Sequence, residues 1–193
     1  TQYKAVLAAY DEQKKAAQAA LGNPAALAPD QREFLEALAK NPPPEHVLRS
    51  LFYLSLLQAE DGRFAEALAG FAALVQQFPQ AALVPEAQLR IGFCQMQLKN
   101  WPEAIKNLQP LAEHPQLGDQ ALWWLARSQA GAADPANAPA YEQAVRQAIE
   151  LLRRAADRAN QLAQNDPVAK LRRGDILIET ADTMQLVRLF REA

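Results

Sequence analysis

Apolar side chains recur along this chain every three or four positions, and the pattern is interrupted mainly at prolines and at Asn/Asp-Pro pairs. This spacing places the apolar side chains on one face of an α-helix. No alternating run of Val, Ile and Thr indicates a strand. The pattern therefore predicts an all-α chain, with helices over residues 2–21, 30–38, 45–60, 64–78, 84–99, 103–113, 117–130, 141–164 and 168–187.

The segment Asn41-Pro42-Pro43-Pro44 is the sharpest interruption of this pattern. Proline lacks a backbone N–H and restricts the residue before it to extended geometry, so a helix does not continue through this segment. We therefore expect a domain boundary here. An N-terminal helical pair would occupy residues 1–44, and consecutive antiparallel hairpins would occupy residues 45–193.

The part of the chain after residue 44 repeats itself. Ala67 and Ala104 each follow an aromatic residue by three positions, and they are 37 residues apart (104 − 67 = 37). Ser55 and Gly92 have the same separation (92 − 55 = 37), and each lies 12 positions before its alanine. Two helices approach closely only where side chains are small, so these residues are expected to mark the crossing points of helical hairpins. A hairpin cannot bury both of its faces alone, so the hairpins are expected to stack.

The repeated pattern resembles the tetratricopeptide repeat (TPR) family. The signature residues of the first two units are Leu54-Ser55, Gly62-Arg63-Phe64, Ala67, Phe71 and Phe78-Pro79, then Ile91-Gly92, Asn100-Trp101, Ala104, Leu108 and Pro115. A third unit retains Leu125-Ala126 and then departs from the family pattern. The resemblance implies a right-handed TPR-like solenoid, with units over 45–79, 84–115, 117–165 with a lengthened turn, and an incomplete unit over 167–193.

The Phe78-Pro79 ending and the 37-residue step are closest in style to bacterial envelope members of the family. Examples are the periplasmic coordinator of the tol-pal system and outer-membrane assembly lipoproteins. On this resemblance alone, we expect a periplasmic or envelope location rather than a cytoplasmic one. The fourth unit stops where its second helix should begin, so we expect the sequence to belong to a larger protein.

In this family, the first helices of successive hairpins line a concave groove that binds a peptide or helix of a partner. Carried over by position, the groove-facing residues are aromatic, aliphatic, Met or Arg: Phe52, Leu56, Leu89, Arg90, Phe93, Met96, Trp123 and Arg127. Aromatic and Arg side chains often dominate the binding energy of protein interfaces. The resemblance therefore implies a scaffold for protein–protein interaction.

Three alternatives remain open. The N-terminal helices could fold into the groove and fill it. Two copies of the chain could associate through apolar surface at the open ends of the stack. The chain could also be the non-catalytic arm of a larger enzyme.

Charge and composition exclude several other classes. The chain has 20 Lys+Arg against 22 Asp+Glu, a balance unlike that of most nucleic-acid-binding domains. It contains no run of about 18 apolar residues, the length that a membrane span needs. Cys94, His46 and His114 are too few for a disulfide, a thiolate cluster or a zinc site. We therefore expect no nucleic acid, membrane span, cofactor or metal.

Asp175, Glu179 and Asp182 follow one another at steps of four and three, so they share one helical face. Carboxylates can act in acid–base chemistry or hold a metal when they converge in a pocket. No histidine is near in sequence, and a solvated helix face explains the spacing equally well. With no nucleophile motif and no Gly-rich phosphate loop, we expect a protein that is not an enzyme.

Gln58, Gln95 and Gln129 occupy equivalent positions in three leading helices (95 − 58 = 37 and 129 − 95 = 34). The family usually has a large apolar residue there. We expect tolerated surface polarity, with hydrogen bonds between hairpins or to a bound backbone as the alternative. Cys94 is expected in the core, as is one of the adjacent pair Trp123-Trp124.

Overall fold

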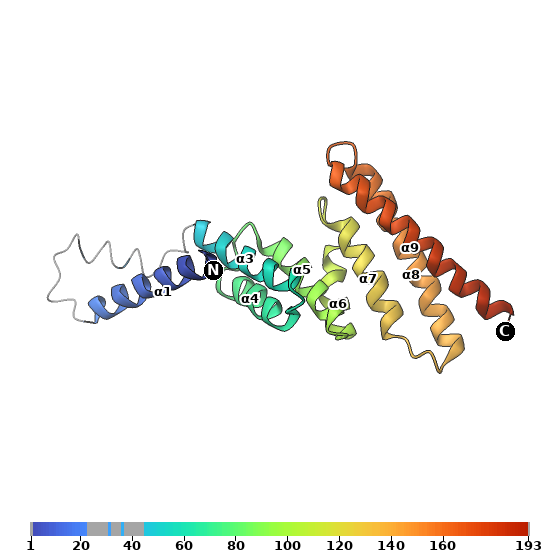
Figure 1. Ribbon diagram of the computed structural model, residues 1–193, viewed down its shortest axis with the longest axis horizontal. Helices are drawn as coiled ribbons and strands as arrows, with labels where there is room; N and C mark the ends of the chain where they lie inside the picture. The colour runs from blue at the N-terminus through green and yellow to red at the C-terminus, as the bar shows by residue number, and fades with distance from the viewer. Residues whose placement is uncertain (1, 23–30, 32–35, 37–44, 193) are drawn as a thin grey trace. The chain divides into compact units, whose positions relative to one another are not determined.

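The computed structural model describes residues 2–22, 31, 36 and 45–192 (Figure 1). Every regular element in this part of the chain is helical, which confirms the predicted all-α fold. The elements are α1 (Gln2–Leu21), α3 (Glu45–Glu60), α4 (Phe64–Gln77), α5 (Val84–Gln97), α6 (Trp101–Leu108), the 3-10 helix η2 (Gln109–Leu111), α7 (Gly118–Ala132), α8 (Ala138–Leu162) and α9 (Pro167–Glu192).

The chain divides into two compact units, residues 1–84 and 85–193, and each is described by itself. The helix expected over residues 30–38 lies largely outside the described residues, and so does the boundary expected at Pro44. The first unit therefore contains α1, α3 and α4, and the second contains α5 to α9.

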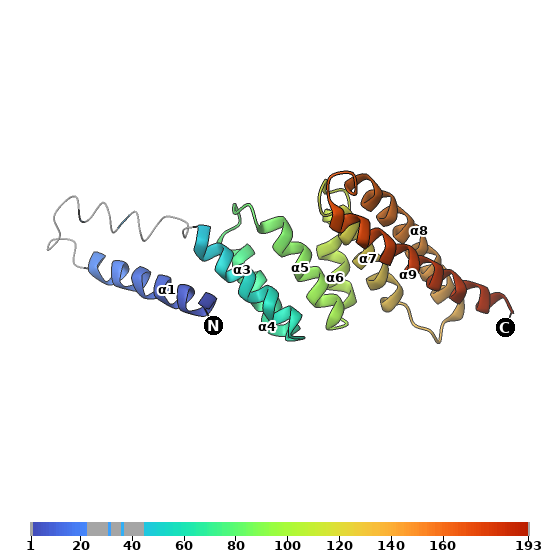
Figure 2. The ribbon, with the colours of Figure 1, turned by 45° about the horizontal axis from the view of Figure 1, so that its top comes forward.

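In the first unit, α3 packs against both α1 and α4 (Figure 2). The ring of Phe52 on α3 is buried edge-on against Phe71 of α4, with 5.4 Å between the ring centroids. The neighbouring Tyr53 stacks on Tyr3 of α1 at 6.0 Å. Adjacent aromatic side chains on α3 therefore join the hairpin on one side and the N-terminal helix on the other.

The hairpins cross where side chains are small, as the repeat predicted. In the α3–α4 hairpin, a Cβ added to Gly70 would lie 2.1 Å from the Oγ of Ser55. In the α5–α6 hairpin, a Cβ added to Gly92 would lie 2.5 Å from two carbons of Leu108. The crossing points at Ser55 and Gly92 are thus confirmed, although the residue that meets each of them differs.

The turns of these two hairpins share one backbone geometry. Gly62 follows α3 with a φ of 76°, and Lys99 follows α5 with a φ of 58°. In each turn, the next residue donates its N–H to the carbonyl five positions earlier, at 2.8 Å in the first turn and 2.9 Å in the second. This arrangement is the Schellman motif, whose left-handed position favours glycine.

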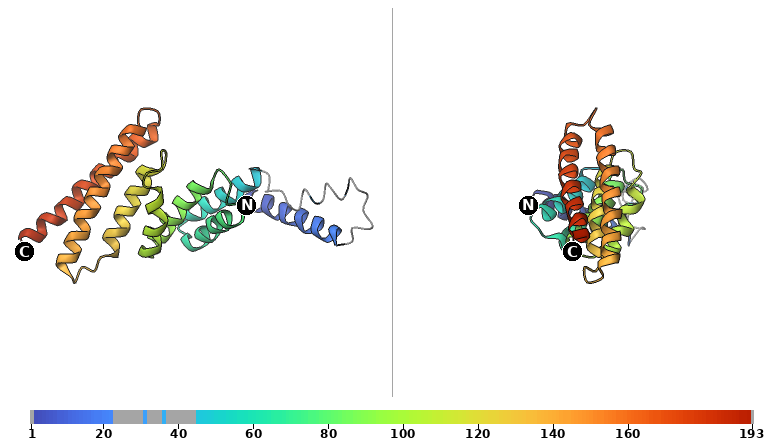
Figure 3. Two further views of the ribbon diagram at one scale, coloured as in Figure 1. Left: turned by 180° about the vertical axis from the view of Figure 1, so that it is seen from behind. Right: turned by 90° about the vertical axis from the view of Figure 1, so that its right-hand side faces the viewer.

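In the second unit, α7 packs against α6 and α8, and α8 packs against α9 (Figure 3). Leu122 of α7, Ile176 of α9 and the α8 residues Leu152 and Ala155 form one buried cluster. Alanines on α8 let its neighbours approach closely. α8 therefore supplies buried residues that pack against both α7 and α9.

The third hairpin differs from the expectation of a lengthened turn. α7 ends at Ala132 and α8 begins at Ala138, so the connection is short and the extra residues extend α8. Asn137 caps α8 by accepting the N–H of Ala140 at 3.4 Å. Pro139 lies in the first turn, where a helix does not need the missing N–H.

Candidate functional site

The predicted groove residues divide according to burial. Phe52, Leu89 and Met96 are only 3%, 0% and 5% exposed. Leu89 and Met96 belong to a core cluster with Leu108 and Trp124, while Phe52 packs against α4. Their helices bury these side chains to join neighbouring helices, so they are not available to a partner, contrary to the prediction. Leu56 is half-buried in the first unit.

Arg90 and Phe93, both half-buried on α5, surround Trp124 of α7. The rings of Phe93 and Trp124 lie 4.7 Å apart, and the Cζ of Arg90 lies 5.7 Å from the centroid of Trp124. Trp124 is buried, so it is the core member of the tryptophan pair. These contacts make Arg90 and Phe93 part of the α5–α7 interface, so only part of each side chain is accessible to a ligand.

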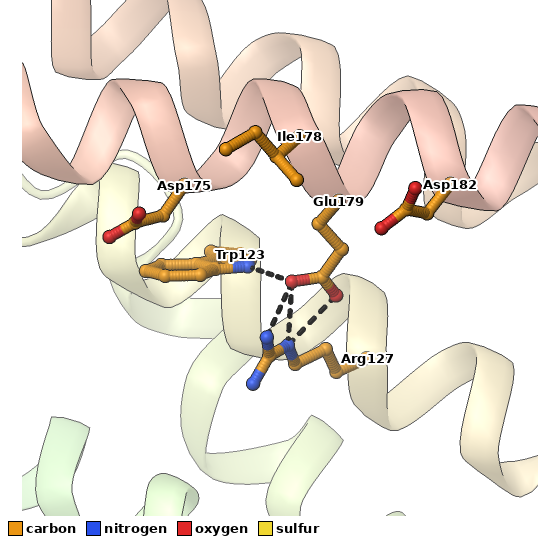
Figure 4. Close-up of a pocket in the computed structure, with 6 residues that line it drawn as sticks. All are labelled: Trp123, Arg127, Asp175, Ile178, Glu179 and Asp182. Atoms are coloured by element: carbon orange, nitrogen blue, oxygen red, sulfur yellow. Dashed lines mark hydrogen bonds and ion pairs between the residues drawn. The ribbon is translucent and has the colours of Figure 1, made fainter.

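Trp123 and Arg127 of α7 meet Glu179 of α9 (Figure 4). The indole Nε1–H donates to Glu179 Oε2 at 2.6 Å. The Nε of Arg127 donates to both oxygens of the same carboxylate, at 2.8 and 2.9 Å. The Cζ of Arg127 also lies 5.0 Å from the centroid of the Trp123 ring. One carboxylate therefore holds an indole and a guanidinium in fixed positions.

These three residues border a pocket of about 390 Å³ between α7 and α9. Its lining consists of Trp123, Arg127, Asp175, Ile178, Glu179 and Asp182. The volume falls within the range of about 300–1,000 Å³ that is usual for ligand pockets. Two predicted groove residues and the carboxylate face of α9, which the sequence pattern does not connect, thus contribute to one site.

The pocket continues onto one side of α9, which we call the α9 strip. Its members are spaced by three and four residues: Val168, Leu171, Asp175, Ile178 and Asp182. Ile178 is 65% exposed and Leu171 is 71% exposed, although both are large and apolar. These apolar residues are absent from the predicted site, although the spacing that links the carboxylates also reaches them.

The pocket holds three carboxylates and one guanidinium, which gives it a formal charge of −2. The Arg127 guanidinium balances Glu179. Among the side chains that the structure describes, Asp175 and Asp182 have no ion-pair partner. The site is therefore an acidic pocket with an exposed apolar wall.

The pocket contains neither histidine nor cysteine. Within the described ranges, no three His, Cys, Asp or Glu side chains are arranged to hold a metal ion. No described helix is long and apolar enough to cross a membrane. Cys94 is in the core, as predicted, and burial raises the pKa of its thiol to about 11. This thiol is therefore protonated at neutral pH and unsuited to act as a nucleophile.

Two of the three glutamines are buried, so the prediction of surface polarity is wrong for them. Gln58 and Gln95 are each 9% exposed. Gln58 donates to Glu66 Oε2 at 3.2 Å, and Gln95 accepts from Asn107 Nδ2 at 2.9 Å. Each bond links the two helices of one hairpin rather than two hairpins, so these glutamines act within their own repeat.

The sequence from residue 58 to residue 130 matches the family model described as tetratricopeptide repeat. This segment covers the end of α3 through most of α7. Neither the curated proteins nor the solved structures gave a match. The match supports the family inferred from the repeat, but it gives no support to envelope members in particular. Residues 58–130 are therefore similar to tetratricopeptide repeats, within a fold whose described elements are all helical.

Proposed function

We propose that this protein is a scaffold that binds a peptide or helical segment of a partner protein in the α7–α9 pocket. Tetratricopeptide repeats generally mediate protein–protein interaction. The observation that carries the proposal is the exposed Ile178 beside Trp123 and Arg127 in an open pocket. Ile178 shares its side of α9 with the exposed Leu171 and Val168, and several large apolar side chains exposed on one face are typical of an interaction surface.

The cluster around Glu179 supports this role because it orders the binding groups in advance. Trp123 and Arg127 are both held by the Glu179 carboxylate, so a ligand would lose less side-chain entropy on contacting them. Thr183 donates its Oγ1–H to the Glu179 backbone carbonyl at 2.7 Å. The pocket therefore presents a rigid indole and guanidinium to a partner.

The proposed role is non-catalytic, as is typical of the family. Glu179, the most enclosed carboxylate of the pocket, is already engaged by Trp123 and Arg127. The role as the arm of a larger enzyme and the envelope location remain predictions.

The exposed apolar residues of the α9 strip favour a second candidate, in which two copies of the chain associate through α9. Sedimentation velocity over a range of concentrations distinguishes the two candidates. A chain that stays monomeric at the highest concentration excludes self-association. A dimer that Ile178→Ser dissociates would assign the strip to a second copy.

Site-specific photo-crosslinking in the source cells tests the scaffold proposal. A benzoylphenylalanine replaces Ile178 in one variant and Leu177 in the matched control. Leu177 is also exposed, but it does not line the pocket. We expect an adduct with a second protein from position 178 and none from position 177. The same adducts from both positions, or adducts only with another copy of the chain, would contradict the proposal.

A further inference from the structure

Every charged residue of the α9 strip carries the same sign. Asp175 and Asp182 lie on either side of Glu179 along α9 (Figure 4). From this pattern we infer that the bound segment is basic. A Lys or Arg side chain of the partner enters the pocket between Asp175 and Asp182, and its apolar neighbours cover Ile178 and Leu171. This inference rests on the proposed function and names the chemistry of its partner.

Asp175 and Asp182 differ in their ion pairing from other described carboxylates on α7 and α9. Glu179 is paired with Arg127, and Asp119 is paired with Arg172. The side chains of Asp175 and Asp182 have no cation among the described residues, although both line the pocket. The pocket therefore keeps a net negative charge after Arg127 and Glu179 pair, and such a charge attracts groups of the opposite sign. The two aspartates therefore favour a cationic ligand.

The apolar members of the α9 strip also favour a basic segment. A segment that covers Ile178 and Leu171 must also cover the aspartate between them, because all three lie on one side of α9. A neutral or acidic segment would remove water from Asp175 without replacing its hydrogen bonds. A Lys or Arg side chain avoids this penalty because its head pairs with the carboxylate.

The shape of a Lys or Arg side chain also fits the lining of the pocket. The aliphatic stems of Lys and Arg pack along apolar surface while their charged heads reach polar groups. The exposed Ile178 lies between Asp175 and Asp182 in the lining and provides that apolar surface. An amphipathic helix with Lys or Arg beside its apolar positions would match the three- and four-residue spacing of the strip.

Selection from a displayed peptide library tests this inference without a known partner. The library contains helical peptides with fixed apolar positions and all other positions randomised, and the protein is used as the full chain. We expect selected peptides to be enriched in Lys and Arg over Asp and Glu. The affinity of the best peptide should fall about tenfold or more in the Asp175→Asn/Asp182→Asn variant, and it should weaken as salt increases.

Asp157→Asn is the matched control, because Asp157 is exposed on α8 and does not line the pocket. This variant should bind the peptide as the wild type does. Peptides that lack a Lys/Arg bias but lose binding with Ile178→Ser would overturn the basic partner and keep the proposed function. Peptides insensitive to both Ile178→Ser and the aspartate substitutions, or an empty selection, would overturn both.

Discussion

Asp119, in the first turn of α7, accepts a hydrogen bond from Nε of Arg172 on α9, at 2.8 Å between the heavy atoms. The Asp119 side chain is fully buried, and that of Arg172 is 17% exposed. Arg172 also donates to Asp166, at 3.3 Å, just before α9 begins. This ion pair joins two helices that are separated in sequence by the whole of α8, and it therefore fixes the start of α9 against α7.

Substitution of Arg172→Met should lower the free energy of unfolding by about 3 kcal/mol, because it leaves a buried carboxylate without its cation. Urea denaturation measures this loss. Arg173→Met is the control, since Arg173 is exposed and in no ion pair among the described side chains. The double variant Asp119→Leu/Arg172→Met should recover much of the stability. An Arg172→Met variant as stable as Arg173→Met would show that the pair contributes nothing.

Two glycines within helices should respond oppositely to alanine. Gly92→Ala should destabilise by about 1–3 kcal/mol, because its new Cβ would overlap Leu108, which is fully buried and cannot move aside freely. Gly174→Ala should stabilise by roughly 0.5–1 kcal/mol, because nothing lies within 4 Å of its Cβ and alanine favours the helix. Thermal unfolding of both variants measures the difference. Equal shifts would refute the close α5–α6 crossing.

Lys99→Gly should raise the free energy of unfolding by about 0.5–1 kcal/mol, because Lys99 holds a positive φ that glycine adopts without strain. The reciprocal change, Gly62→Lys, should lower it by a similar amount at the equivalent turn. Chemical denaturation of the two variants provides the comparison. A loss of stability in Lys99→Gly would mean that the lysine side chain contributes more than the strain removes.

Cys94 should make stability depend on pH in the alkaline range. Burial raises the pKa of its thiol from the ordinary value of 9.0 to about 11, while the nearby Arg90 lowers it by less. Below pH 9 the thiol is protonated in both states. Between pH 9 and 11 the unfolded chain releases this proton and the folded chain retains it, so the free energy of unfolding falls as pH rises.

The Cys94→Ala variant should lack this fall in the free energy of unfolding, which is on the order of 2 kcal/mol between pH 9 and 11. Urea denaturation of both proteins at several pH values measures the difference between their slopes, in which other titrating groups cancel. Parallel pH profiles would show that the folded environment does not shift the thiol.

The hairpins could be predicted from sequence because their signals are local. The helix at residues 45–60 has the bounds that its apolar spacing indicated. The predictions fail where proline has two possible roles. Pro139 lies in the first turn of α8, where a lengthened turn was expected. Pro110 lies in the 3-10 helix η2, where the helix expected over residues 103–113 would continue. Proline stops a helix in its interior but fits its first turn, and spacing alone does not distinguish these positions.

The pocket was less predictable because it depends on which side chains of α7 and α9 face each other. Glu179 meets Trp123 and Arg127 across sequence separations of 56 and 52 residues. The alignment of α9 against α7 follows from the length and packing of α8, and no local sequence pattern predicts it. Family position likewise assigned Phe52 and Leu89 to a groove, whereas the packing of their helices buries them.

The two hairpin crossings described above have a consequence for modular exchange. Ser55 is matched to Gly70, whereas Gly92 is matched to the larger Leu108. Because equivalent positions are 37 residues apart, exchanging α4 with α6 would bring Asn107 to the place of Gly70 beside Ser55, and the larger Phe71 to the place of Leu108 beside Gly92. The repeats thus share a backbone plan, but each first helix is complementary only to its own second helix, so shuffled chimeras would need compensating substitutions at both crossings.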